Sequence, residues 1–208
     1  MADRLRTGID VLDRKLDGGL PAGSVLALRA APASQAELLL YAFTVPRETL
    51  YLTLDRTELA VADSLRRTAV DTGDPTVQYV EDDARVDHAV ELVRQLPRQA
   101  TLIINPHTRF ESMERSQYLE FMNKLRLHVI DTESVAILYC LDGHEPPALR
   151  DTTLHMADIV FDLRTRVVGS QIENSLAVLK FRGGRALTET IKLRLADGIR
   201  IDTSRDIA

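Results

Sequence analysis

The chain has 208 residues, of which 45% are hydrophobic and 27% are charged. This composition is typical of a globular protein with enough residues for one domain and a sizeable core. The net charge of -5 gives no overall case for nucleic-acid binding. The single cysteine, Cys140, excludes a disulfide framework and a thiolate metal site. Without a signal peptide or a membrane-spanning apolar run, we expect a cytoplasmic protein.

The charge is distributed unevenly along the chain. Residues 164–200 contain eight Lys or Arg against three acidic residues, a net charge of +5, so the remainder carries -10. This asymmetry fits a head-to-tail contact between subunits, a local anion site, or the solvated faces of amphipathic strands.

The hydrophobic pattern predicts alternating strands and helices through the first three quarters of the chain. A short helix capped by Asp10 is expected near the start, and a glycine-rich turn over 17–23 leads into a buried strand at 24–30. Further strands are predicted at 49–54, 77–80, 101–104 and 134–141, with helices at 35–43, 55–72, 87–96, 112–131 and 148–156.

The pattern changes after residue 158, where helical spacing gives way to strands joined by glycine-containing turns. These strands are predicted at 159–168, 175–182, 188–195 and 199–201. The order favours an α/β protein with a mostly parallel central sheet, flanked by helices, and a C-terminal antiparallel β meander. Because no interdomain linker is evident, we expect one domain over 1–208, with a core at about 7–201 and a short tail at 202–208.

The segment from Ser24 to Phe43 has the strand, loop and helix order of a phosphate-binding loop, whose motif is GxxxxGK[ST]. The residues aligned with this motif depart from it at every defining position. Ala and Gln resist the positive φ that the glycines adopt, alanine supplies no cation, and glutamate would repel phosphate. Ala30 and Gln35 take the glycine positions, Ala36 the lysine position and Glu37 the Ser/Thr position, with Ala33 and Ser34 between them.

Ser34 and Glu37 have the S-x-x-E spacing of a capping box. We expect Ser34 to accept a hydrogen bond from the backbone N–H of Glu37, and Glu37 to reach back to the N–H of Ser34. In that case the protein's own side chains occupy the donors that would hold phosphate. An ordinary βα turn without ancestry in nucleotide binding is the alternative.

With this element order, the chain resembles the KaiC-like branch of the RecA ATPase superfamily, which includes archaeal RecA-paralogue and gas-vesicle-regulator relatives. Residues 7–24 are similar to the family motif TGIxxLDxxLxGGLPxGS, residues 179–184 to LKxRG, and residues 197–201 to DGIxV. The resemblance covers about 7–201 and implies a RecA-like P-loop NTPase core. Relatives assemble as rings with nucleotide at the subunit joints.

The catalytic positions depart from the family pattern. The Walker B strand at 101–104 ends in Asn105, a poor ligand for a hard cation. Asp55 matches the usual catalytic carboxylate, and it would either polarise water or cap the next helix; Arg56 follows where a second acid is common. Lys180 and Arg182 match the basic pair that reaches the neighbour's nucleotide, and without nucleotide they would serve a salt bridge or an interface.

Other candidate groups are scattered. His107, Arg109, His144 and Glu145 are expected at carboxyl ends of strands, where they could line a remnant pocket. The histidines have no metal-binding spacing, so we expect no metal site. Cys140 lies in an apolar run and is expected to be a small buried side chain.

These observations predict a catalytically inactive KaiC-like pseudo-ATPase that uses no cofactor, neither ATP nor Mg²⁺. It would act as a regulatory or scaffolding protein through a protein partner or an active paralogue, and a homo-oligomer is also expected. One alternative is a DNA-associated accessory factor of the recombinase-paralogue type, which would use the basic C-terminal third. Another is an ATPase that binds nucleotide unconventionally, using Arg29, Lys180 or Arg182 for phosphate and Asp55 for water.

Overall fold

The computed structural model describes residues 3–81, 85–185 and 187–202, in which strands and helices alternate up to residue 156. The strands are β1 (Arg4–Leu5), β2 (Leu20–Pro21), β3 (Ser24–Ala30), β4 (Thr49–Thr53), β5 (Thr76–Tyr79), β6 (Thr101–Asn105), β7 (Val135–Leu141), β8 (Ile159–Val168), β9 (Gln171–Phe181), β10 (Ile191–Leu195) and β11 (Ile199–Ile201). The helices are α1 (Asp10–Lys15), α2 (Glu37–Ala42), α3 (Glu58–Arg67), α4 (Arg85–Arg94), the 3-10 helix η1 (His107–Ser112), α5 (Arg115–Asp131) and α6 (Arg150–Met156).

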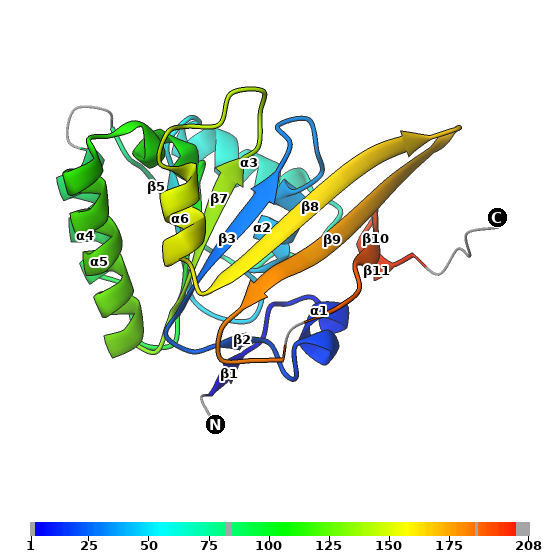
Figure 1. Ribbon diagram of the computed structural model, residues 1–208, viewed down its shortest axis with the longest axis horizontal. Coiled ribbons are helices and arrows are strands. Elements are labelled where there is room, and N and C mark those ends of the chain that lie inside the picture. Colours follow the sequence, from blue (N-terminus) through cyan, green and yellow to red (C-terminus); the bar gives the residue numbers. More distant parts are fainter. Residues whose placement is uncertain (1–2, 82–84, 186, 203–208) are drawn as a thin grey trace.

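A nine-stranded sheet in the order β11-β10-β9-β8-β3-β7-β6-β4-β5 forms the body of the molecule (Figure 1). The pairs from β8 through β3, β7, β6 and β4 to β5 are parallel. Strand β9 pairs antiparallel with β8, and β10 and β11 continue the antiparallel part. The predicted fold class is therefore confirmed, and β1 and β2 form a separate two-stranded sheet.

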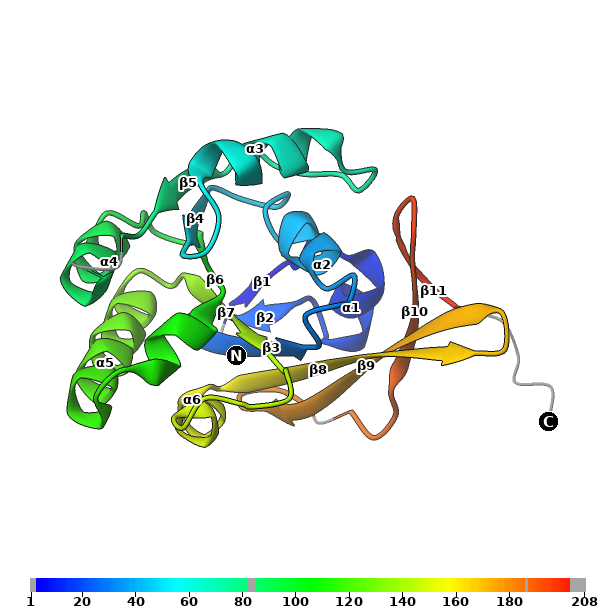
Figure 2. The ribbon, with the colours of Figure 1, turned by 90° about the horizontal axis from the view of Figure 1, so that it is seen from above.

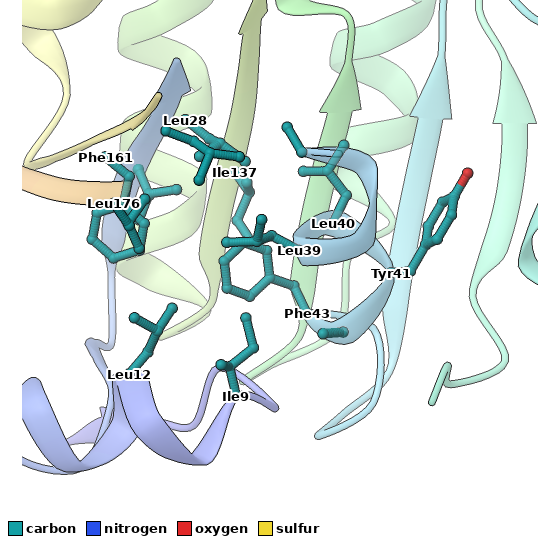
Figure 3. Packing of buried hydrophobic residues seen from close by; sticks show 14 of the residues in the cluster. Ile9, Leu12, Leu28, Leu39, Leu40, Tyr41, Phe43, Ile137, Phe161 and Leu176 are labelled. Carbon is teal, nitrogen blue, oxygen red and sulfur yellow. The ribbon is translucent and has the colours of Figure 1, made fainter. Parts of the chain in front are cut away.

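The sheet is covered on both faces, which is why its central strands are almost continuously apolar. Leu26 and Leu28 of β3 point into one cluster with α1 and α2, whereas Val25 and Ala27 point into a second cluster with α4 and α5. Figure 2 shows α2 and α5 on opposite sides of the sheet. Figure 3 shows the first cluster, where Phe43 and its neighbours pack between α2 and the sheet.

The opening motif TGIxxLD forms a hydrogen-bonded turn. Both the backbone N–H and the hydroxyl group of Thr7 donate to Oδ1 of Asp13, at 2.7 and 2.8 Å. The prediction that Asp10 caps the first helix was wrong, because the N-cap is Ile9 and no side chain caps α1. Asp10 instead forms an ion pair with Arg6. The buried carboxylate of Asp13, and not Asp10, therefore accepts the hydrogen bonds from the turn that precedes α1.

The glycines of the opening region are required by close backbone contacts. Gly19 has a φ of +122°, and a Cβ atom there would lie 2.2 Å from the carbonyl oxygen of Leu5. Gly8 has a φ of +80° and would meet the carbonyl oxygen of Ala42 at the same distance. Only glycine fits these positions without moving the backbone.

Helix boundaries differ from the predicted ones where polar side chains cap the helices. The helix predicted at 55–72 corresponds to α3, which begins later, at Glu58. It begins there because Thr57 is its N-cap and accepts a hydrogen bond from the N–H of Ala60. The helix predicted at 112–131 begins at Arg115, where Glu114 accepts from the N–H of Ser116 at 2.7 Å.

Residues 203–208 of the expected tail lie outside the described residues. Among the described helices, none has both the length and the apolar character needed to cross a membrane.

Candidate functional site

The carboxyl ends of the parallel strands β3, β4 and β6 meet at one edge of the sheet, where α/β proteins place their sites. The loop at 31–36 leaves β3 here and enters α2. Three residues that the sequence resemblance placed at metal and catalytic positions lie together at this edge. They are Glu37 at the start of α2, Arg56 after β4 and Asn105 at the end of β6.

Glu37 is the centre of a hydrogen-bonded network. Nη1 of Arg56 donates to both of its carboxylate oxygens, at 3.1 and 3.3 Å. The side-chain amide of Asn105 donates to Oε1 of Glu37 at 3.4 Å and to the hydroxyl oxygen of Tyr51 at 2.6 Å. The hydroxyl group of Tyr41 donates to Oε2 of Glu37 at 3.3 Å. Figure 3 shows the Tyr41 hydroxyl directed away from Phe43 and the apolar cluster around it.

The network makes the predicted capping box wrong. The N-cap of α2 is Ala36, without a side-chain cap, and Oγ of Ser34 accepts a long hydrogen bond from the N–H of Ala36 at 3.4 Å. Glu37 turns toward Arg56 instead of Ser34. A carboxylate gains more from a charged guanidinium than from a neutral backbone N–H, and this favours the observed partner.

Burial and the carboxylate of Glu37 shift the pKa values of the side chains around it. Burial raises the pKa of Tyr41, and the nearby charge of Glu37 raises it further. Burial likewise raises the pKa of Tyr51, so both hydroxyl groups stay protonated donors or acceptors. For Arg56, partial burial lowers the pKa, but Glu37 and Tyr41 outweigh this and the net shift is upward. The Arg56–Glu37 ion pair is 37% and 38% exposed, so solvent screens it in part.

A second ionic network lies beside the loop on the β7 side. Nη2 of Arg29, near the end of β3, lies 2.8 Å from a carboxylate oxygen of Asp142. Arg150 of α6 is buried and donates to both oxygens of the buried Glu111, at 2.8 to 3.0 Å. Nη1 of Arg150 is 3.9 Å from Asp142, which links the two pairs. Arg29, a proposed phosphate ligand, is therefore already paired.

Of the four residues expected to line a remnant pocket, His107 lies in the core instead. His107 is fully buried, and its Nε2 lies 2.9 Å from the hydroxyl oxygen of Tyr118. Burial lowers the pKa of His107 to about 4, so the imidazole is neutral. His144 and Glu145 are exposed in the loop between β7 and α6. The prediction that His107 lines a pocket was wrong because this residue belongs to the core, and for Arg109, His144 and Glu145 it stays a prediction.

Asp55 and Arg109 form an ion pair, with Nε of Arg109 2.5 Å from Oδ1 of Asp55. The alternative that Asp55 caps the next helix was wrong, because Thr57 is the N-cap of α3. The alternative that Asp55 activates water stays a prediction.

Lys180 and Arg182 bind the end of α6 within the same chain. The ammonium group of Lys180 donates to the carbonyl oxygens of Leu154 and His155 at 3.0 and 2.8 Å. Arg182 lies 3.6 Å from the carboxylate of Asp158. Cations at a helix C-terminus satisfy its free carbonyl groups. The predicted salt bridge is present for Arg182, and contact with a neighbouring subunit stays a prediction.

Sequence reasoning missed most of the partners in these networks. Tyr41 and Tyr51 are core residues whose hydroxyl groups reach the site, and Glu111 and Arg150 are 39 positions apart in the chain. Cys140 is buried as expected, and burial raises its pKa. The described residues contain no cluster of His, Cys, Asp or Glu able to hold a metal ion.

Comparison with solved structures supports the fold. The crystal structure of KaiC-like protein PH0186 from the hyperthermophilic archaeon Pyrococcus horikoshii OT3 is similar with a TM-score of 0.79. The similarity covers 97% of this chain and 100% of that one, at 13% sequence identity. At this identity the match shows a KaiC-like, RecA-like fold and nothing about activity. A search of curated proteins found no match.

A sequence family covers almost the whole chain. Residues 4–208 match the family described as "Family of unknown function (DUF7125)". The expected KaiC-like resemblance is thus confirmed at the level of the fold, and the family assignment comes from sequence. The chain belongs to the DUF7125 family, with a RecA-like α/β fold in which Glu37, Arg56 and Asn105 meet at the loop after β3.

Proposed function

We propose that this chain is a catalytically inactive KaiC-like pseudo-ATPase that acts as a regulatory or scaffolding protein through contacts with other proteins. The observation that carries the proposal is the network joining Glu37, Arg56 and Asn105. By the resemblance to KaiC-like proteins, these three residues stand where relatives have the Ser/Thr metal ligand, a common second acid and the Walker B acid. Side chains of the protein therefore satisfy one another where metal and phosphate would be held.

The chemistry of the network opposes Mg²⁺ and triphosphate. Magnesium requires oxygen ligands in near-octahedral geometry, whereas Asn105 directs its amide donor toward Glu37 and Tyr51. The guanidinium of Arg56 already provides the positive charge beside Glu37. Each charge-assisted phosphate contact is worth about 1.5–3 kcal/mol, so the absence of the lysine and the metal ligands removes several kcal/mol.

The unconventional ATPase is less well supported, because each proposed ligand has another partner. Arg29 pairs with Asp142, and Asp55 pairs with Arg109. Lys180 lies opposite Val160 near the start of β8, whereas the loop at 31–36 follows the end of β3. Within one chain, Lys180 therefore lies toward the amino ends of the parallel strands, whereas the loop lies at their carboxyl ends.

Titration with ATP and Mg²⁺, followed by calorimetry and by thermal unfolding, tests the proposal. We expect no saturable heat and no change in melting temperature. The matched control changes Ala30→Gly, Gln35→Gly, Ala36→Lys, Glu37→Thr and Asn105→Asp in one variant, which restores the motif and should gain binding. Tight, saturable binding of Mg-ATP to the natural chain would contradict the proposal.

A second candidate, a DNA-associated accessory factor, is favoured by one observation. Arg194 of β10 and Arg200 of β11 lie directly opposite each other in register. Both are exposed, and neither has a hydrogen-bond or ion-pair partner within the described ranges. Like charges opposite each other destabilise a strand pair, and a phosphate group would relieve the repulsion.

Retention on duplex DNA at increasing salt tests this candidate, because phosphate contacts weaken steeply with salt. Retention that falls when Arg194 and Arg200 are both changed to Ser would support it. The control is Arg98→Ser, which removes an arginine paired with Glu133. Absence of retention at the lowest salt would dispose of the candidate.

A further inference from the structure

Strand β11 lies at an edge of the nine-stranded sheet, and β10 is its one neighbour in the described parts of the chain. The backbone N–H of Asp202 donates to the carbonyl oxygen of Lys192 at 2.9 Å, so these two residues form a hydrogen-bonded pair. Such pairs alternate with non-hydrogen-bonded pairs along an antiparallel ladder. The N–H and C=O groups of Ile199 and Ile201 therefore point away from β10, and no hydrogen bond within the described residues reaches them.

A groove runs along this open edge. One of its walls is the turn and strand at 197–201, and the other is formed by α1 with the residue before it and by 69–71 after α3. This space, here called the β11 groove, has a volume of about 500 Å³, and its apolar lining includes the buried Val11, Ala42 and Val70. Figures 1 and 2 both show β11 beside α1. The open backbone edge therefore adjoins a space that can hold a short segment of another molecule.

The side chains of β11 divide between the two faces of the sheet. Ile199 and Ile201 share the face that packs against the apolar cluster, and Ile201 is 41% exposed. Arg200 lies between them on the other face, directly opposite Arg194 of β10. A strand laid beside β11 would thus meet two apolar side chains on one face and, on the other, two cations that repel each other.

We propose that the β11 groove binds an extended segment of a partner protein, which adds to the sheet as an antiparallel strand beside β11. An extended polypeptide supplies the backbone donors and acceptors that pair with Ile199 and Ile201, as in other cases of strand addition to a sheet edge. The residue directly opposite Arg200 is Asp or Glu, because an opposite charge relieves the repulsion from Arg194. Its two neighbours are apolar, because they lie on the face of Ile199 and Ile201.

The backbone edge and the side chains together favour a polypeptide over a nucleic acid. A nucleic acid offers phosphate to Arg200, but it has no strand-like backbone for the open edge and no apolar side chains for the groove. In an antiparallel strand pair, Arg200 takes a non-hydrogen-bonded position, where opposite Cα atoms are only about 4.5 Å apart and side chains are closest. The inference deepens the proposed function, since it rests on the proposed contact with other proteins and names the chemistry of that contact.

Fluorescence anisotropy with the labelled heptapeptide KTVEVTK as the probe tests the proposal. We expect saturable binding to the natural chain, with KTVQVTK about 2- to 5-fold weaker and KTVKVTK weaker still, because the central residue faces Arg200. N-methylation of both valines removes the donors that pair with β11, so the methylated KTVEVTK should not bind. Absence of saturable binding of KTVEVTK up to about 1 mM would overturn the proposal. Binding that N-methylation leaves unchanged would overturn it as well.

Variants of the chain separate the charge from the backbone. Arg200→Glu should reverse the preference, so that KTVKVTK binds more tightly than KTVEVTK. Ile201→Pro removes an N–H group that points away from β10, which an edge strand tolerates, and it should weaken KTVEVTK at least about 5-fold. Ile201→Val is its control and should bind like the natural chain. Arg98→Gln, which removes an exposed arginine paired with Glu133, should leave binding unchanged. If the proline variant fails to fold, the methylated peptide still tests the backbone pairing.

Other occupants of the groove give different results. Duplex DNA retained through Arg200 by a chain that does not bind KTVEVTK would overturn the proposal in favour of a nucleic acid. A mass in sedimentation velocity above the 23.2 kDa of one copy, lost in Ile201→Pro, would make a second copy the occupant and overturn it too. The titration with Mg-ATP has a separate readout: bound nucleotide contradicts the pseudo-ATPase alone, and unbound peptide contradicts this inference alone.

Discussion

Nη1 of Arg56 lies 3.1 Å from one carboxylate oxygen of Glu37 and 3.3 Å from the other, across 19 positions of sequence. Because both side chains are more than one third exposed, screening limits the strength of the pair. We expect Glu37→Gln to lower the free energy of unfolding by about 0.5–1.5 kcal/mol. A double-mutant cycle with Arg56→Met should give a coupling of about 0.5–1 kcal/mol.

The matched control for this cycle is Asp63 with Arg66, an exposed pair one helical turn apart, which should give a coupling close to zero. Urea denaturation measures all the variants. Equal coupling in both cycles would show that Glu37 and Arg56 form no more than an ordinary surface pair.

The buried pair of Glu111 and Arg150 should matter more. Glu111→Gln keeps the shape but leaves the guanidinium of Arg150 buried with only Asp142, 3.9 Å away, as a counter-charge, at a cost of about 3–5 kcal/mol. Replacing both residues, as Glu111→Leu with Arg150→Met, should recover part of this loss. Glu120→Gln, which breaks an exposed pair with Lys124, should cost less than about 1 kcal/mol. A Glu111→Gln variant as stable as the natural chain would refute the importance of the pair.

His107 should make stability depend on pH in the acidic range. Burial lowers its pKa to about 4 in the folded chain, whereas an unfolded histidine titrates near 6.5. Below pH 6.5 the unfolded chain binds a proton that the folded chain does not. The free energy of unfolding should therefore fall as the pH falls from 6.5 to 4, by up to about 1.4 kcal/mol per pH unit.

Denaturation of the natural chain and of His107→Gln at several pH values measures this contribution. The other four histidines are unchanged in the variant, so the difference between the two slopes reports His107 alone. Identical slopes for the two proteins would mean that His107 takes up a proton in the folded state as easily as in the unfolded one.

Cys140 should be unreactive in the folded protein. Its side chain is fully buried, and burial raises its pKa, so the reactive thiolate is scarce. A thiol reagent at pH 8 should label the native chain slowly, and the labelling rate should rise with urea in parallel with unfolding. Rapid stoichiometric labelling without denaturant would contradict the buried position.

Gly19 and Gly169 provide a matched pair of glycine substitutions. An alanine Cβ at Gly19 would lie 2.2 Å from the carbonyl oxygen of Leu5 at a φ of +122°, and Gly19→Ala should cost at least about 1–3 kcal/mol. Gly169, in the turn between β8 and β9, has a φ of +60° and no atom within 4 Å of such a Cβ. Gly169→Ala should cost only about 1 kcal/mol. Thermal melts compare them, and equal losses would show that the close contact at Gly19 relaxes.

The sequence by itself determined the order of elements and the class of fold. The runs of β3, β6 and β7 consist almost entirely of apolar residues because both faces of their sheet are covered. Such runs can be recognised in the sequence as buried strands. The glycine-rich turn of the opening region could also be predicted from the sequence, because glycine is the residue that adopts a positive φ without strain. That residues 30–37 lack the glycines and the lysine of the motif GxxxxGK[ST] is a statement about residue identity, which needs no coordinates.

The tertiary structure alone decided which partners the polar side chains take. Glu37 pairs with Arg56 and not with the nearby Ser34, and Asp55 pairs with Arg109. Both ion pairs form because segments far apart in sequence bring charged side chains to the same end of the sheet. His107 lies in the core because Phe110 of its own 3-10 helix and Tyr118 and Phe121 of α5 surround its ring. The projection of β8 and β9 beyond the sheet likewise depends on where the adjacent strands end, because a strand is exposed only where its neighbours stop.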